Sequence, residues 1–133
     1  MKLTIPKLKN KLDRIFSRYI RLRDCIATTG TLDNGRCITC GKIITFKSSH
    51  AGHFQSRRYG STRYHEKNVK LQCSYCNCFQ AGEQYAFSKE IDRIYGKGTA
   101  EELEQLAHRE YHFKRYELEE LIKYYTAKVK EME

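Results

Sequence analysis

The chain has 133 residues, a mean hydropathy of -0.73 and a formal net charge of +9. This length suits one domain with a modest core, and no apolar run comes near the roughly 20 residues that span a bilayer, which excludes a membrane-spanning protein. The N-terminus has no apolar stretch of the kind that marks a secretory signal, so we expect a cytoplasmic protein with reduced cysteines and no membrane partner. The excess of basic residues favours a polyanionic partner, and we expect nucleic acid.

The first predicted element is a basic helix within residues 1–28. After Pro6, which the first turn of a helix tolerates, apolar residues recur at a spacing of three and four to about Cys25. Residues 1–24 contain eight Lys and Arg against two Asp. Their polar face suits a phosphate backbone and equally suits solvent. The candidate nucleic-acid-binding residues on this face are Arg14, Arg18 and Arg21.

Two cysteine pairs give the strongest signal in the sequence. They are Cys37-x-x-Cys40 and Cys73-x-x-Cys76. A gap of two residues lets each pair chelate one tetrahedral ion, so we predict a structural zinc ion held by all four thiolates rather than disulfides. The alternative, four buried free thiols, is disfavoured by this spacing. The other two cysteines, Cys25 and Cys78, follow no pairing pattern and are interpreted as structural.

The segment between the cysteine pairs must itself be folded, because 32 residues separate them. Before the first pair, Asp33-Asn34-Gly35 predicts a turn. After it, Ile43–Phe46 and His53–Phe54 predict the two strands of a hairpin, and residues 68–72 predict a further extended segment. The second pair opens a short helix that ends near Gly82.

An arginine-rich loop from Gln55 to Tyr64 follows the predicted hairpin. Arginines interleaved with tyrosines fit clamps on the phosphates of a scissile strand, and a solvated loop has the same composition. The candidate nucleic-acid-binding residues of this region are Arg57, Arg58, Arg63 and Lys70.

Helices follow the second cysteine pair. The first is predicted over Glu83–Tyr95 and ends at a glycine-rich break. Thr99 and Glu102 then form a capping-box pattern for a helix over Ala100–His108. The last is predicted over Arg115–Lys130, with apolar residues on one face that we interpret as a packing scaffold or a dimer surface.

These patterns predict an α+β fold that is mostly helical. Residues 1–133 are expected to form a single domain, in which the basic helix of residues 1–28 precedes a zinc-stapled core. The core is placed at residues 36–82, and residues 83–133 form a helical extension.

Short motifs along the chain resemble a known family. The motifs "RLRD", "RCITCGK", "AGHF", "TRYHEKNV" and "QCSYCN" look like those of the NinG/Rap family of phage recombination endonucleases, within the HNH or ββα-metal nuclease superfamily. The resemblance implies an HNH core within residues 36–82. It also implies a metal-dependent endonuclease that hydrolyses phosphodiester bonds in branched DNA, such as Holliday junctions, in the cytoplasm of a host cell.

The same resemblance assigns roles to three residues. His53 corresponds to the general base, Asn77 to a ligand of a catalytic Mg²⁺ or Mn²⁺ ion, and Asn68 to the residue that orders the hairpin and the base. A neutral imidazole that titrates near pH 6.5 is a suitable base at cellular pH. The hard ion would stabilise charge on the phosphoryl and leaving oxygens.

The second ligand of this ion departs from the superfamily pattern. The superfamily often has Asp directly before the base, where this chain has Gly52. In the family pattern, His50 takes the place of an acidic residue and becomes the candidate second ligand. An imidazole suits Mn²⁺ or a transition ion better than Mg²⁺.

Two other functional interpretations stay open. A non-catalytic zinc-containing DNA-binding protein would use the basic first helix for its main contacts, and an RNA-binding protein would use the arginine-rich loop with its tyrosines. Symmetric cleavage of a junction would favour a homodimer, for which the final acidic helix is the candidate interface.

Overall fold

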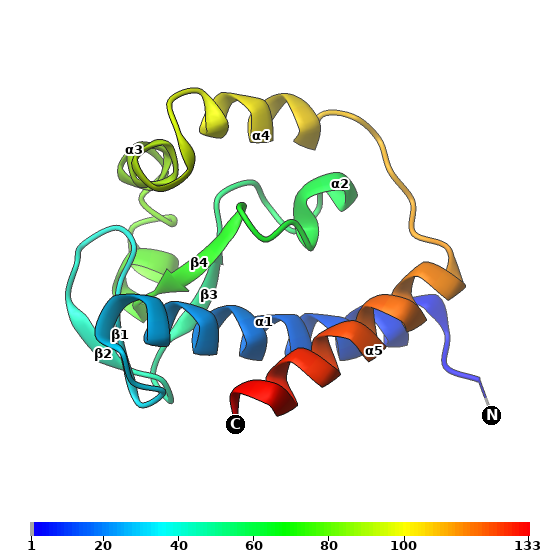
Figure 1. Ribbon diagram of the computed structural model, residues 1–133. Coiled ribbons are helices and arrows are strands. Elements are labelled where there is room, and N and C mark those ends of the chain that lie inside the picture. The colour runs from blue at the N-terminus through cyan, green and yellow to red at the C-terminus, as the bar shows by residue number, and fades with distance from the viewer. Residues whose placement is uncertain (1) are drawn as a thin grey trace.

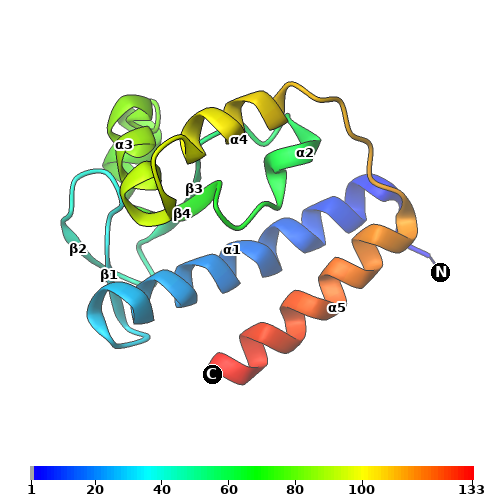
Figure 2. The ribbon, with the colours of Figure 1, turned by 45° about the horizontal axis from the view of Figure 1, so that its top comes forward.

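The structure is a computed structural model that describes residues 2–133, except for the side chain of Phe79. Two long helices lie side by side, two shorter helices lie on the opposite side, and the strands lie between these layers (Figures 1 and 2). This arrangement confirms a mixed, mostly helical α+β fold. The elements are α1 (Ile5–Thr29), β1 (Asn34–Arg36), β2 (Ile43–Thr45), β3 (His50–His53), α2 (Gly60–Arg63), β4 (Val69–Gln72), η1 (Tyr75–Phe79), α3 (Gln84–Tyr95), α4 (Thr99–Ala107) and α5 (Arg115–Met132).

Helix α1 follows the predicted basic helix and extends one turn further. The Thr4 side chain accepts a hydrogen bond from the Lys7 backbone N–H, Pro6 lies in the first turn, and Gly30 ends the helix in the left-handed region. Its apolar face packs against α5 and the strand region in one core. The buried members of this core are Leu8, Leu12, Phe16, Ile20, Tyr64, Val69, Leu118 and Tyr125.

Helix α5 is a packing scaffold for α1. Leu118 is fully buried, and the rings of Phe16 and Tyr125 meet edge to face at 4.9 Å. Arg18 near the middle of α1 pairs with Glu133 at the end of the chain. The apolar face that we considered for a dimer is therefore buried within the chain.

The predicted hairpin between residues 43–46 and 53–54 is wrong. Strand β2 pairs antiparallel with β1, and β3 pairs antiparallel with β4, from His50 opposite Gln72 to His53 opposite Val69. Two residues of the turn predicted at Asp33-Asn34-Gly35, Asn34 and Gly35, belong to β1. The first cysteine pair lies in the loop that joins β1 to β2. The extended segment predicted at residues 68–72 is confirmed as β4.

The predicted capping box at Thr99 is also wrong. Thr99 is the first residue of α4, and its hydroxyl donates to the Gly96 carbonyl at 2.7 Å. The Asp92 carboxylate accepts from the Ala100 backbone N–H at 2.9 Å, so a side chain from α3 satisfies the start of α4. Over residues 2–133, none of the helices combines the length and apolar character that crossing a membrane requires.

Helices α3 and α4 enclose a second apolar cluster. It contains Phe54, Phe87, Ile91, Ala100 and Leu103. Phe54 directly follows β3, and its backbone N–H donates to the Asn68 carbonyl at 2.8 Å. The strand region is therefore packed from both sides, by α1 below and by α3 and α4 above in the view of Figure 1.

Candidate functional site

The fold brings both cysteine pairs together. The Sγ atoms of Cys37, Cys40, Cys73 and Cys76 lie within 4.8 Å of one another, with 3.9 Å between those of Cys40 and Cys73. Zinc–thiolate bonds of about 2.3 Å in a tetrahedron place sulfur atoms about 3.8 Å apart. The four cysteines therefore fit one zinc ion, as their spacing predicted.

Local hydrogen bonds favour a thiolate at Cys37. Burial raises the pKa of this thiol, but the Thr39 hydroxyl and nearby backbone N–H groups, including that of Cys40, outweigh burial and lower the pKa to about 6. A metal ligand must be deprotonated, so this environment suits metal binding.

The cysteine cluster is joined to strand β4 by backbone and side-chain hydrogen bonds. The Ile38 N–H donates to the Leu71 carbonyl at 2.9 Å. The Gln72 amide nitrogen donates to the Thr39 hydroxyl at 3.1 Å and to the Gly82 carbonyl at 2.8 Å. The position of the cluster therefore fixes the position of the β3–β4 pair.

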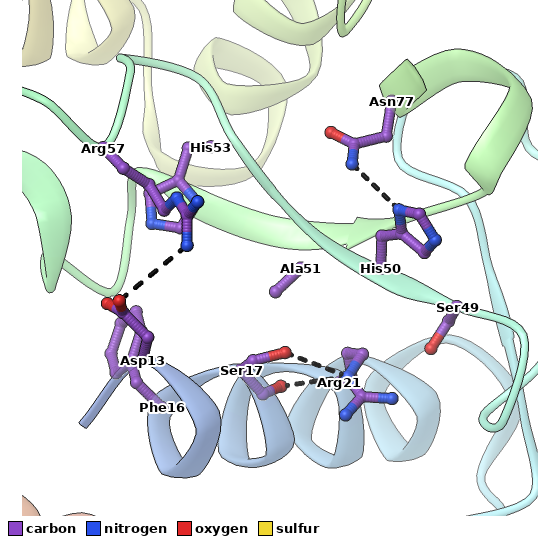
Figure 3. A pocket seen from close by; sticks show the side chains of 10 residues that line it. All are labelled: Asp13, Phe16, Ser17, Arg21, Ser49, His50, Ala51, His53, Arg57 and Asn77. Atoms are coloured by element: carbon purple, nitrogen blue, oxygen red, sulfur yellow. Dashed lines mark hydrogen bonds and ion pairs between the residues drawn. The ribbon is translucent and has the colours of Figure 1, made fainter. Parts of the chain in front are cut away.

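A polar cleft of about 490 Å³ lies between β3, α1 and the start of η1 (Figure 3). It brings together the predicted base and both predicted ligands of the catalytic ion. Its lining residues are Asp13, Phe16, Ser17, Arg21, Ser49, His50, Ala51, His53, Arg57 and Asn77.

The imidazole of His53 has a fixed orientation in this cleft. Its Nε2 lies 3.0 Å from the Arg63 carbonyl, which can only accept, so Nε2 carries the hydrogen and Nδ1 keeps a free electron pair. Burial lowers the pKa of His53 to about 4, and the nearby Arg57 charge adds to this effect. The imidazole is therefore neutral at cellular pH, and its pKa is lower than the value near 6.5 that the sequence suggested.

The two predicted metal ligands contact each other. The Asn77 amide nitrogen donates to Nδ1 of His50 at 2.9 Å. The amide oxygen of Asn77 is thus turned toward the side of the cleft where His53 lies (Figure 3). Cys78, which we interpreted as structural, is exposed, with its Sγ 3.9 Å from the same His50 nitrogen.

Asn68 orders the loop that supports the His53 imidazole. It is fully buried, and its amide nitrogen donates to the carbonyls of Gln55 and Thr62 at 3.1 and 3.0 Å. Its amide oxygen accepts from the Gln55 N–H at 2.8 Å. These bonds fix both ends of the loop between His53 and Arg63, whose carbonyl holds the imidazole.

Gly52, directly before His53, lies in close contact with the Gln72 side chain. Gly52 is buried, and a Cβ atom there would lie 2.1 Å from Oε1 of Gln72. An aspartate at this position would therefore require the Gln72 side chain to move. The Gln72 side chain was not predicted, because its contact with residue 52 depends on the β3–β4 register.

The predicted nucleic-acid-binding residues fall into two groups. Arg14 and Arg58 are exposed, and the exposed Arg57 lies 3.8 Å from the Asp13 carboxylate. Arg18 pairs with Glu133, and Arg21 lines the cleft and donates to the Phe46 carbonyl at 3.2 Å. Two other cations have internal partners.

Arg63 donates to both carboxylate oxygens of Asp13, at 3.1 and 2.6 Å. Lys70 is nearly enclosed, and its ammonium donates to the Tyr95 hydroxyl at 3.1 Å and lies 3.6 Å from the Asp24 carboxylate. These internal partners leave Arg63 and Lys70 less accessible to a phosphate than the exposed arginines of the same loop.

The fold and the site define a mostly helical α+β protein in which a four-cysteine frame, suited to zinc, adjoins a cleft lined by histidine and asparagine. The family described as Bacteriophage Lambda NinG protein matches residues 4–133. The chain belongs to this family. No curated protein and no solved structure matches the chain.

Proposed function

We propose that this NinG-family protein is a metal-dependent DNA endonuclease of the HNH type that hydrolyses phosphodiester bonds in branched DNA. In this proposal β3, β4 and η1 form the ββα-metal core. The observation that carries the proposal is the His53 imidazole, which presents an unprotonated Nδ1 in the same cleft as His50 and Asn77.

His53 acts as the general base. Its Nδ1 takes a proton from the water that attacks the scissile phosphorus, while the hydrogen bond from Nε2 to the Arg63 carbonyl stabilises the imidazolium that forms. Asn68 acts indirectly, because it fixes the loop that carries this carbonyl. The reaction forms no covalent intermediate with the protein.

Asn77 and His50 would hold the catalytic ion. Because the Asn77 amide nitrogen occupies Nδ1 of His50, the remaining donor atoms are the Asn77 amide oxygen and Nε2 of His50. This mixed oxygen and nitrogen set suits Mn²⁺ better than Mg²⁺. The bound ion supplies charge stabilisation for the phosphoryl and leaving oxygens.

The zinc ion held by the cysteines would position the site without taking part in the reaction. Asn77 directly follows Cys76, so the frame sets the start of η1. Arg21 and Arg57 line the cleft and place positive charge beside the position of the scissile phosphate.

The alternative is a zinc-containing DNA-binding protein without catalysis. One observation favours it: burial lowers the pKa of His53 to about 4, which makes the imidazole a weaker base than a free histidine. In this case α1 and the cleft would contact DNA without cutting it.

Cleavage of a labelled four-way DNA junction with Mg²⁺ or Mn²⁺ tests the proposal. We expect the unaltered protein to cut and His53→Ala to lose about 100-fold or more of the rate, as removal of a general base does. His65→Ala is the matched control, because His65 lies on the same connection outside the cleft. If the unaltered protein and both variants bind the junction but none of them cleaves it, the DNA-binding alternative is supported. Preferential binding of single-stranded RNA would count against DNA as the substrate.

A further inference from the structure

A second groove adjoins the candidate active site. The connection between α4 and α5, residues 108–114, passes beside α2 (Figures 1 and 2). The Ser61 hydroxyl donates to the Leu106 carbonyl at 2.6 Å, and a Cβ atom at Gly60 would lie 2.4 Å from the Tyr111 carbonyl oxygen. This close approach requires glycine at residue 60 and places the connection against the arginine-rich loop.

The groove between these two segments is strongly basic. It has a volume of about 440 Å³, and its cations are Lys9, Arg57, Arg58, Arg63 and Arg109. Of the carboxylates in the described part of the chain, only Glu110 lines it, and this side chain pairs with His112 at 2.9 Å. Asp13 pairs with Arg63 and also lies 3.8 Å from the Arg57 guanidinium, so the least compensated positive charge lies mainly on Arg58 and Arg109.

Aromatic rings line the same groove. The Arg58 guanidinium lies 5.0 Å from the centre of the Tyr59 ring, and the His108 ring meets Tyr59 edge-on at 5.3 Å. Tyr111 is 43% exposed and packs edge-on against Phe113. Cationic grooves with accessible aromatic rings are typical of single-strand binding, because phosphates meet the cations and unpaired bases stack on the rings.

The groove and the cleft share Arg57, which lines both. A strand whose scissile phosphate lies beside His53 can therefore continue past Arg57 into the groove without leaving positively charged surface.

We propose that this groove binds the single-stranded DNA segment next to the cleaved phosphate, so that the connection between α4 and α5 is part of the substrate-binding surface. This inference rests on the proposed nuclease function for the position of the cut. It assigns an unpaired strand at a branch point as the feature of the substrate that the protein recognises.

The test compares binding of a labelled 20-nucleotide single-stranded DNA with a 20-base-pair duplex, without added Mg²⁺ or Mn²⁺. The variant Arg58→Ala/Arg109→Ala removes two groove cations, and Lys97→Ala/Lys123→Ala removes two exposed cations outside the groove as a matched control. We expect the groove variant to bind single-stranded DNA about tenfold more weakly, with a salt slope reduced by roughly 1.4, or 0.7 per phosphate. Duplex affinity should change less than twofold, as should both affinities of the control.

A second variant, Tyr111→Ala, separates stacking from charge. It should weaken single-strand binding about fivefold or more while leaving the salt slope unchanged. Circular dichroism of each variant verifies that the fold is retained. Equal losses for duplex and single strand, unchanged affinity of the groove variant, or tighter groove-dependent binding of RNA than of DNA would each overturn the inference. Cleavage that depends on His53 but not on the groove would overturn this inference and leave the proposed function standing. Groove-dependent binding without cleavage would support this inference and overturn the proposed function.

Discussion

The α1–α5 pair and the strand region from β1 to η1 are stabilised by different means. The helices bury large apolar side chains such as Phe16 and Leu118, each at most 1% exposed. The strand region buries apolar side chains such as Val69 but also polar groups, among them Asn68 and Gln72, and collects four cysteines at one end. The helical side is therefore held together by apolar burial, whereas the strand region also relies on buried polar contacts and on a four-cysteine cluster that fits a zinc ion. The cleft lies where the two sides meet.

Removal of zinc is expected to have the largest effect and to separate the two regions. Binding of zinc to such sites contributes about 10–16 kcal/mol, so a strong chelator should abolish hydrogen-exchange protection over residues 34–82 while residues 5–29 and 115–132 keep more of theirs. Cys40→Ala should act in the same way, and Cys78→Ala should retain one zinc ion per chain. Equal protection of the strand region with and without zinc would contradict the assignment of the four cysteines.

Truncation of a side chain in the helical core should destabilise the protein while leaving its zinc site intact. Leu118→Ala removes a fully buried side chain and should lower the free energy of unfolding by about 2–5 kcal/mol, measured by denaturant titration. Its zinc content should stay at one ion per chain. Leu3→Ala, at a residue that is 41% exposed, is the control and should change stability by less than about 0.5 kcal/mol. Loss of zinc in Leu118→Ala would show that the two regions do not fold separately.

A methyl group at residue 52 tests the packing of the strand region. Gly52→Ala should lower the free energy of unfolding by about 1–3 kcal/mol, because the new Cβ collides with the Gln72 side chain. Gln72→Ala removes the colliding atoms, so the double variant should be more stable than the sum of the single changes predicts. Additive effects in this cycle would refute the steric explanation for the missing aspartate.

The smallest expected effect is the pH dependence that His53 gives to stability. Its pKa is about 4 in the folded protein and near 6.5 when unfolded, so between these values the unfolded chain binds more protons. Stability should therefore fall as the pH is lowered from 6.5 towards 4, by about 1–2 kcal/mol between pH 7 and pH 5. His53→Ala should flatten this slope in urea titrations, and an unchanged slope would show that the imidazole is not buried.

The sequence predicted best what depends on neighbours along the chain. The apolar spacing of three and four residues located α1 and α5, and the paired cysteines located the metal frame. The sequence did not predict contacts between residues that are distant along the chain. The partners of β2 and β3, the Asp13 carboxylate that holds Arg63 and the Gln72 side chain over Gly52 all depend on register and packing. The low pKa of His53 was not predicted for the same reason, because burial is a property of the folded chain.

The pairing of α1 with α5 also has a consequence during synthesis. The first long helix to leave the ribosome packs against the last, and residues 30–114 are made between them. At 5–20 residues per second, α1 waits on the order of ten seconds for its partner. The strand region is made within this interval, but its contacts with α3, α4, the connection before α5 and α5 itself form only later. The face of α1 that packs against α5 is therefore exposed until Leu118 and Tyr125 have been made.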